Sequence, residues 1–199
     1  MAFAVSEFKT NLKGGGARPS LFTVDIDAAL TQLGIAPPAS SKFLIKGASI
    51  PTSTIGTYDV FYHGKAIHVA GDRTFETWDT TIVNDEDYGI RIAIEKWMDL
   101  VADHKLNSRQ LNNSEGETAS YKKSIKVTQF SKTGEHLHHY HFLGAFPTTL
   151  SAIALDWATA SEIEEYTVTW TYDRWMPGTS AKGPLTTVDH LLSTEKHTA

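Results

Sequence analysis

Residues 163–175, IEEYTVTWTYDRW, decide the fold class of this 199-residue chain. Large apolar side chains recur at every second position, and threonines fill the positions between them. The apolar set is Tyr166, Val168, Trp170 and Tyr172, and the polar set is Thr167, Thr169 and Thr171. A period of two is typical of a strand that is buried on one face and wet on the other. We therefore predict a strand that ends at Pro177-Gly178 and whose threonine face borders water.

Similar strand-like runs lie elsewhere in the chain. They cover residues 20–26, 42–50, 57–71, 74–83, 121–130, 136–146 and 150–157. The run 57–71 predicts a hairpin that turns at His63-Gly64, because glycine tolerates the positive φ of a two-residue turn. In the last run, LSAIALDW, apolar residues alternate as they do on one face of a strand.

One segment has helical rather than strand periodicity. Its apolar residues recur at intervals of three and four, which places them on the core face of an amphipathic helix. These residues are Ile90, Ile94, Trp97 and Val101. The acidic run NDED at 84–87 precedes them and is expected to cap the helix N-terminus.

Many antiparallel strands and one amphipathic helix indicate a mainly β fold. We expect an antiparallel β-sandwich or barrel with the helix packed on one flank. The glycine triplet at 14–16 predicts that residues 1–17 form a flexible N-terminal arm. The folded domain is then expected to span residues 18–176, with a polar loop at 106–118. Residues 177–199 are expected to form a polar C-terminal extension.

Composition excludes several classes of protein. The chain has no cysteine, which excludes a disulfide scaffold, a thiol nucleophile and cysteine-ligated zinc. Its 18 basic and 23 acidic residues give a net charge of −5 at pH 7, which argues against a protein that grips nucleic acid by charge. No run resembles a secretory signal or a membrane span. We therefore expect a protein that is made in the cytoplasm and does not bind membranes itself.

The histidine-rich run 136–141 is the strongest candidate for chemistry, because two histidines at i and i+2 on a strand can bind a metal. Cupin-type barrels also need a carboxylate and a third histidine downstream, and residues 142–155 contain no Asp, Glu or His. We expect instead that His139 and His141 lie on a water-facing strand face, without metal or cofactor. Serine-nucleophile, P-loop and dinucleotide-binding motifs are also missing from the sequence, so no enzymatic activity is expected.

Four stretches then follow the order of a known family. They are GARPSLFTVDI from Gly16, GASIPTSTIGTYDVFYHGKAIHVAGDRTFETWDTTIVNDED from Gly47, ASYKKS from Ala119 and GAFPTTLSAIALDW from Gly144. Together they resemble the tail tube proteins of contractile-tailed bacteriophages, and the VAGDRTFETW…VNDE block is the most specific part. The resemblance implies a barrel-like β-sandwich with one helix. It also implies homohexameric rings that stack into a hollow tube inside a contractile sheath.

The same resemblance implies partners and a location. The partners are further copies of the chain, sheath subunits, and baseplate and tail terminator proteins, with DNA only in passage and without sequence-specific contact. The implied location is the virion tail, after assembly in the host cytoplasm. Three alternatives stay open: a tube subunit of a contractile bacteriocin or type VI secretion system, a metal-dependent β-barrel enzyme that uses the His136–His141 cluster, and a small-ligand binding module.

The segment AGDRTF at 70–75 carries the candidate interface residues. Gly71 permits a tight bend and Asp72 can bond nearby backbone amides, so a turn is predicted here. Arginine suits a bidentate contact with a carboxylate, and Arg73 has acidic candidates in the run Asp85, Glu86 and Asp87. We predict that these five residues lie at a subunit interface. In the alternative, Asp72 caps its own turn and Arg73 pairs inside the subunit.

Overall fold

The computed structural model describes residues 5–12, 15–39, 41–104, 121–159 and 161–178. The predicted loop at 106–118 and residues 179–199 of the predicted extension lie outside them. The strands are β1 Phe22–Asp25, β2 Ile45–Ala48, β3 Thr54–Tyr62, β4 Lys65–Thr74, β5 Trp78–Val83, β6 Lys123–Phe130, β7 His136–Leu150, β8 Glu165–Thr171 and β9 Arg174–Gly178. The helices are α1 Val5–Asn11, α2 Asp27–Gln32, α3 Ser41–Leu44 and α4 Gly89–Val101. None of these helices is long and apolar enough to cross a membrane.

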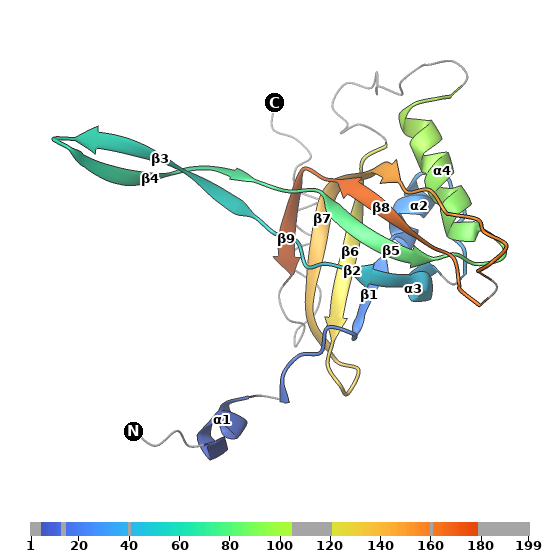
Figure 1. The fold of residues 1–199 in the computed structure, drawn as a ribbon, viewed down its shortest axis with the longest axis horizontal. Coiled ribbons are helices and arrows are strands. Elements are labelled where there is room, and N and C mark those ends of the chain that lie inside the picture. Colours follow the sequence, from blue (N-terminus) through green and yellow to red (C-terminus); the bar gives the residue numbers. More distant parts are fainter. Residues whose placement is uncertain (1–4, 13–14, 40, 105–120, 160, 179–199) are drawn as a thin grey trace.

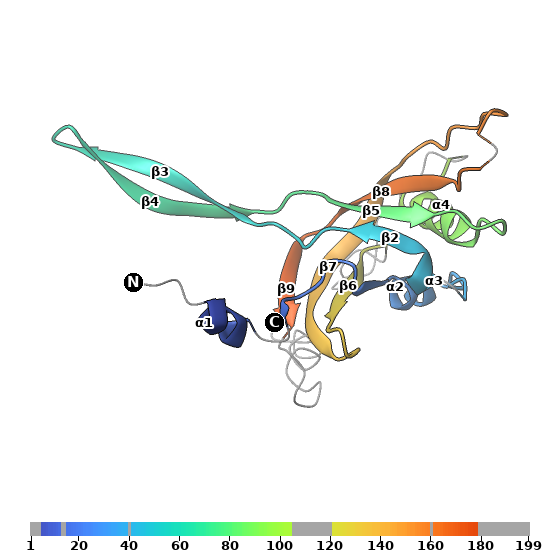
Figure 2. The same cartoon turned by 60° about the horizontal axis from the view of Figure 1, so that its bottom comes forward.

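Antiparallel pairing joins seven strands into one strongly curved sheet (Figures 1 and 2). The strand order is β1-β6-β7-β8-β5-β2, and β9 is added on β7. Strand β7 is 15 residues long and serves both halves of the sheet. Its first part pairs with β6 and β9, and its last part pairs with β8. The mainly β, antiparallel barrel-like fold with a flanking helix is therefore confirmed.

The core lies inside the curve of the sheet and is rich in tryptophan. On β8 the predicted alternation is observed, because Tyr166, Val168 and Trp170 are buried. Trp78 stacks on Phe142 with ring centroids 4.3 Å apart, and Trp97 of α4 meets Trp170 edge-on at 5.5 Å.

The indole N–H groups of the three core tryptophans, Trp78, Trp97 and Trp170, each donate a hydrogen bond. Trp78 donates to the Ser49 carbonyl at 2.8 Å, Trp97 donates to the Tyr121 carbonyl at 2.8 Å, and Trp170 donates to the Thr80 hydroxyl at 2.9 Å. A buried donor without a partner costs about 1–3 kcal/mol, so these bonds fix the ring orientations as well as the burial.

Helix α4 flanks the sheet as predicted, but its N-terminus differs from the prediction. Ile90, Ile94 and Trp97 form its buried face. The run at 84–87 does not cap the helix, which begins at Gly89 after Tyr88 in the left-handed region (φ 52°). The reason is local: Tyr88 N–H bonds the Asp85 carbonyl at 2.8 Å, so the acidic run forms a turn of its own before the helix.

The predicted hairpin is confirmed and is longer than expected. Strands β3 and β4 pair from Thr54↔Thr74 to Tyr62↔Lys65. The turn residues His63 (φ 46°) and Gly64 (φ 77°) are both left-handed, as the twist-compatible two-residue turn requires. The hairpin projects far from the body of the molecule (Figures 1 and 2).

Three strand predictions are corrected. Residues 42–50 begin as the short helix α3 before β2. Residues 151–157 form no strand: the pairing of β7 with β8 stops at Leu150↔Val168, and the Thr167 N–H donates to the Ser151 hydroxyl at 2.8 Å instead of to a backbone carbonyl. The predicted strand 163–175 splits into β8 and β9, and Pro177 and Gly178 are the last two residues of β9.

The N-terminal arm also contains a short element that the sequence did not predict. Helix α1 stands apart from the sheet, on the same side of the body as the hairpin (Figures 1 and 2). Its apolar side chains are exposed, which makes it a second projecting element of the subunit.

Candidate assembly surfaces

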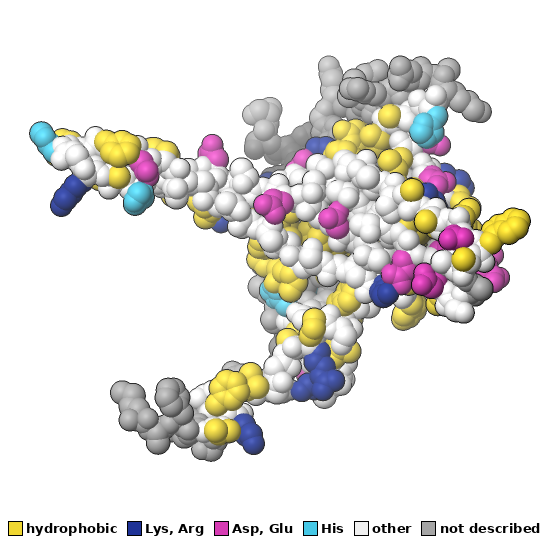
Figure 3. Space-filling model, in the orientation of Figure 1, with side chains coloured by type: hydrophobic (Ala, Val, Ile, Leu, Met, Phe, Trp, Pro, Cys, Tyr) yellow, Lys and Arg dark blue, Asp and Glu magenta, His cyan; other side chains and the backbone are white. Residues whose placement is uncertain are grey.

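The projecting hairpin has one apolar face. Because side chains alternate along paired strands, the strand register gathers five residues on this face. The apolar face consists of Tyr58, Val60, Tyr62, Ile67 and Val69, and Lys65 lies opposite Tyr62 at its outer end. Tyr62 is 67% exposed and Val60 is 47% exposed, so the face is open to solvent (Figure 3).

The opposite face of the hairpin is mixed, because Phe61, which is 73% exposed, lies there opposite Ala66, beside a polar pair. His68 and Asp59 are directly opposite each other, and the Nδ1 and Oδ1 atoms lie 2.5 Å apart. A two-stranded ribbon is at most marginally stable on its own in water. An exposed apolar face on such a ribbon is therefore typical of an element that packs against another protein surface.

Asp72 and Arg73 lie on β4 near the root of the hairpin, and both are exposed. The predicted turn at this segment is wrong, because the chain continues as a strand through a bulge opposite Gly56. Two backbones approach closely there: a Cβ on Gly71 would lie 3.2 Å from the Gly56 carbonyl oxygen. Glycine at both positions permits this contact. Gly71 therefore marks a special backbone position, as predicted, but that position is a bulge instead of a turn.

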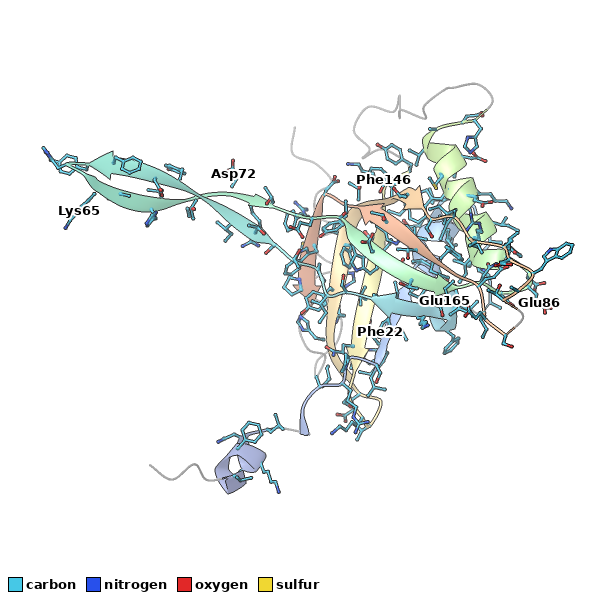
Figure 4. The ribbon with its side chains drawn as sticks, in the orientation of Figure 1. Phe22, Lys65, Asp72, Glu86, Phe146 and Glu165 are labelled. Atoms are coloured by element: carbon cyan, nitrogen blue, oxygen red, sulfur yellow. The ribbon has the colours of Figure 1, made fainter. Side chains whose placement is uncertain are left out.

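The acidic run at 85–87 lies at the opposite end of the body from the hairpin. Figure 4 shows Asp72 on the hairpin and Glu86 at the far end. Within the described residues, no carboxylate forms an ion pair with Arg73. A single subunit therefore does not bring Arg73 together with Asp85, Glu86 or Asp87.

Glu164 organises the acidic end of the body. Its carboxylate accepts hydrogen bonds from Asn84 Nδ2 at 2.8 Å and from the Tyr88 hydroxyl at 3.1 Å. The bond to Glu164 raises the pKa of the Tyr88 phenol. Nearby, Lys46 pairs with Glu165 across 2.5 Å between Nζ and Oε1. These contacts fix the turn that carries the run 85–87 and leave Asp85, Glu86 and Asp87 exposed.

The threonine face of β8 is half-buried in the subunit. Thr167, Thr169 and Thr171 are all partly accessible, between the buried residues of the other face. The Thr169 hydroxyl donates to Asp79 Oδ1 at 2.6 Å, so the face continues as a polar surface onto β5. That this face borders the water of a bore or of the outer surface stays a prediction.

The prediction of a water-facing His139 is wrong, because its side chain is only 8% exposed. Strand β9 pairs beside β7 with Gly178 opposite His139, and the imidazole occupies the space where a Gly178 side chain would lie. Burial lowers the pKa of His139, and the nearby Lys126 lowers it further. His141 is half-buried, and its ring meets that of His139 edge-on at 5.0 Å.

A metal centre finds no support at this histidine-rich strand. In the described part of the chain, no group of three or more His, Asp or Glu side chains is arranged to hold a metal ion. His139 and His141 share a face of β7, while alternation places His138 on the other face. The remaining geometry is that of a structural strand.

The family model for phage tail tube proteins matches residues 17–177. The chain belongs to the phage tail tube protein family. It is 31% identical to the tail tube protein gp19 of Enterobacteria phage T4 and 30% identical to that of phage T6. Each match spans 163 residues, which is 81% of this chain and 92% of the relative.

Solved structures show that other members of contractile assemblies share the tail tube fold. The cap of the anti-feeding prophage matches with a TM-score of 0.59 at 19% identity, over 82% of this chain and 91% of the other. The sheath/tube terminator of an extracellular contractile injection system matches with a TM-score of 0.58 at 19% identity, over 82% and 96%. The relatives above 25% identity are phage proteins, which favours the phage reading over a bacteriocin or secretion system.

Two features of this tail tube protein escaped the sequence prediction of interface residues. One is the apolar face of the hairpin, although Tyr58, Val60 and Tyr62 already alternate in the sequence. The other is the exposed apolar stripe of α1, formed by Val5 and Phe8 of the helix and by Leu12 directly after it. The spacing of this stripe at i, i+3 and i+7 is an amphipathic signal, but a short segment before a glycine triplet gave no reason to expect a helix.

Proposed function

We propose that this tail tube protein forms hexameric rings that stack into the hollow inner tube of a contractile tail. The observation that carries the proposal is the hairpin β3–β4, which projects from the body with an apolar face that its own subunit leaves uncovered. Covering that face requires a surface of another copy. A contact between different surfaces of identical subunits is heterologous, and such contacts generate rings or open stacks.

The charged residues complement this contact. Arg73 at the hairpin root pairs with Asp85, Glu86 or Asp87 of a neighbouring subunit, because the two sites lie at opposite ends of one subunit (Figure 4). A hydrogen-bonded ion pair that is buried on association fixes how two neighbouring subunits align and also strengthens their contact.

The assembled tube is a passage with no chemistry of its own. DNA leaves the capsid through its bore without sequence-specific contacts, and a net charge of −5 at pH 7 limits sticking to phosphates. The outer surface meets sheath subunits, and the two ends meet baseplate and terminator proteins. The protein acts in the virion tail after assembly in the host cytoplasm, and it has no catalytic activity.

The experiment is negative-stain electron microscopy of the purified protein together with two matched variants. Val60→Asp places a carboxylate on the apolar face of the hairpin, and Thr57→Asp places the same group on the opposite face. The parent and Thr57→Asp should form rings or hollow rods, while Val60→Asp should stay a folded monomer. A parent that sediments as a compact monomer at every concentration overturns the proposal, and tubes of Val60→Asp overturn the role of this face.

A further inference from the structure

An apolar groove opens where the two ends of the sheet meet. Strands β1 and β2 are the terminal strands of the order, and the groove lies between their ends and β6. Its lining includes Phe22, Ile50, Val127 and Tyr140. The volume is about 280 Å³, close to the roughly 300 Å³ at which clefts begin to hold organic ligands. The groove therefore has room for an aromatic side chain.

Helix α1 carries a matching apolar stripe. Val5 and Phe8 of the helix and Leu12 directly after it form the stripe, and Phe8 is 66% exposed. A helix of 7 residues is too short to be stable by itself in water. It needs a surface that covers its stripe, and its own subunit does not supply one in this arrangement.

The chain after α1 directs the helix away from its own body. Gly15 (φ 72°) and Gly16 (φ 83°) are both left-handed, and the Gly15 N–H bonds the Leu12 carbonyl at 3.1 Å. Lys132 Nζ lies 3.5 Å from the Gly15 carbonyl oxygen, and Gln129 Nε2 lies 3.4 Å from that of Arg18. These contacts tie the base of the arm to β6 and to the turn after it, and α1 points outward (Figure 1).

We propose that α1 of one copy inserts its apolar stripe, with Phe8 at the centre, into the β1–β2 groove of a second copy. The arm starts at the rim of the groove, since Pro19 belongs to the groove lining. In each copy, the groove that binds the α1 of a neighbour therefore lies next to the residue at which its own arm begins. This exchange rests on the proposed tube assembly and adds a second contact to that of the hairpin.

The hairpin fits the groove less well than α1. Its tip presents His63 and Lys65, whose charges would be desolvated in an apolar lining. Its apolar face is spread along two strands, whereas the groove is short and the α1 stripe contains only Val5, Phe8 and Leu12. A test of the exchange therefore has to distinguish a groove that is occupied by the hairpin from one that is occupied by α1.

Cysteine cross-linking tests the exchange directly, because the natural chain has no cysteine. Phe8→Cys and Ile50→Cys are combined in one chain and treated with a short bis-maleimide during assembly. We expect a ladder of covalent multimers on denaturing gels. The control pair Thr10→Cys and Ile50→Cys places the first thiol on the other side of α1 and should give at most a tenth of the ladder. A pair of His63→Cys with Ile50→Cys reports occupation by the hairpin tip.

The outcomes separate this inference from the proposed function. Tubes that form without a ladder from the Phe8→Cys and Ile50→Cys pair, or with a ladder only from the hairpin pair, overturn the arm exchange and leave the tube proposal intact. A cross-link confined to single chains overturns the choice of a second copy. A ladder from small oligomers in a protein that never forms tubes supports the exchange and overturns the proposed tube.

Discussion

Arg73 is an exposed cation without an ion-pair partner in the described part of its own subunit. We expect Arg73→Ala to melt close to the parent and to form no tubes, because truncating one partner of a buried interfacial pair costs about 2–5 kcal/mol per contact. Thermal unfolding and electron microscopy measure the two effects. Lys96→Ala on the exposed side of α4 removes the same charge and should still assemble. Normal tubes of Arg73→Ala would remove the residue from the interface.

We expect His139 to make the subunit sensitive to acid. Burial lowers its folded-state pKa below the ordinary value of 6.5, and Lys126, His141, His138 and His136 act in the same direction. The unfolded chain therefore binds a proton more readily, so stability is unaffected well above pH 6.5 and falls as the pH drops through that value. Melting temperatures of His139→Gln should fall less steeply between pH 7 and pH 5 than those of the parent.

The control for this prediction is a histidine outside the sheet. His63→Asn at the exposed hairpin turn keeps a residue type that tolerates positive φ and should follow the parent curve. Identical slopes for the parent and His139→Gln would show that His139 is not the acid-sensitive group.

At the scale of elements, the two faces of β8 should respond differently to the same substitution. Val168 is fully buried, and a lysine there leaves an unpaired charge in the core at a cost of several kcal/mol. Thr169 is half-buried beside Asp79, so Thr169→Lys should change the free energy of unfolding by no more than about 0.5 kcal/mol. Urea unfolding of the two variants measures the contrast, and equal destabilisation would contradict the register.

Elements whose periodicity matches their surroundings could be predicted from the sequence. The alternation on β8, the core face of α4 and the hairpin turn at His63-Gly64 are local patterns that the structure reproduces. Residues 151–157 alternate as well, but a strand also needs continued backbone pairing, and the alternation does not report that the Thr167 N–H bonds the Ser151 hydroxyl instead. The break between β8 and β9 could not be predicted from the sequence either, because Tyr172 continues the alternation of apolar and polar residues across it.

Burial by distant segments was the other obstacle. His139 looked like a polar strand residue until β9 covered it, and that pairing joins residues far apart in the sequence. The candidate interface residues Asp72, Arg73, Asp85, Glu86 and Asp87 are exposed. The pairs that we propose for them lie between copies. A single chain therefore predicts the surfaces offered for assembly more readily than the pairs that form between them.

At the scale of the whole molecule, net charge should govern contact with DNA. The charge is −5 at pH 7 with neutral histidines, and protonation of all 9 would bring it to +4. We expect no retardation of duplex DNA in gels at pH 7.5 and physiological salt, and measurable retardation at pH 5 that salt abolishes. Retardation at pH 7.5 would contradict a passive conduit.

Strand β7 constrains how the gene for this protein can change in length. One strand from His136 to Leu150, with register shifts in its ladders to β6 and β8, is paired with β6 and β9 in one half of the sheet and with β8 in the other. A codon gained or lost within it would move the side chains on one side of the change to the wrong face, unless a further bulge absorbed the residue. Residues 151–159 and 161–164 belong to no strand, so related genes should differ in length in this segment and keep the length of β7 fixed.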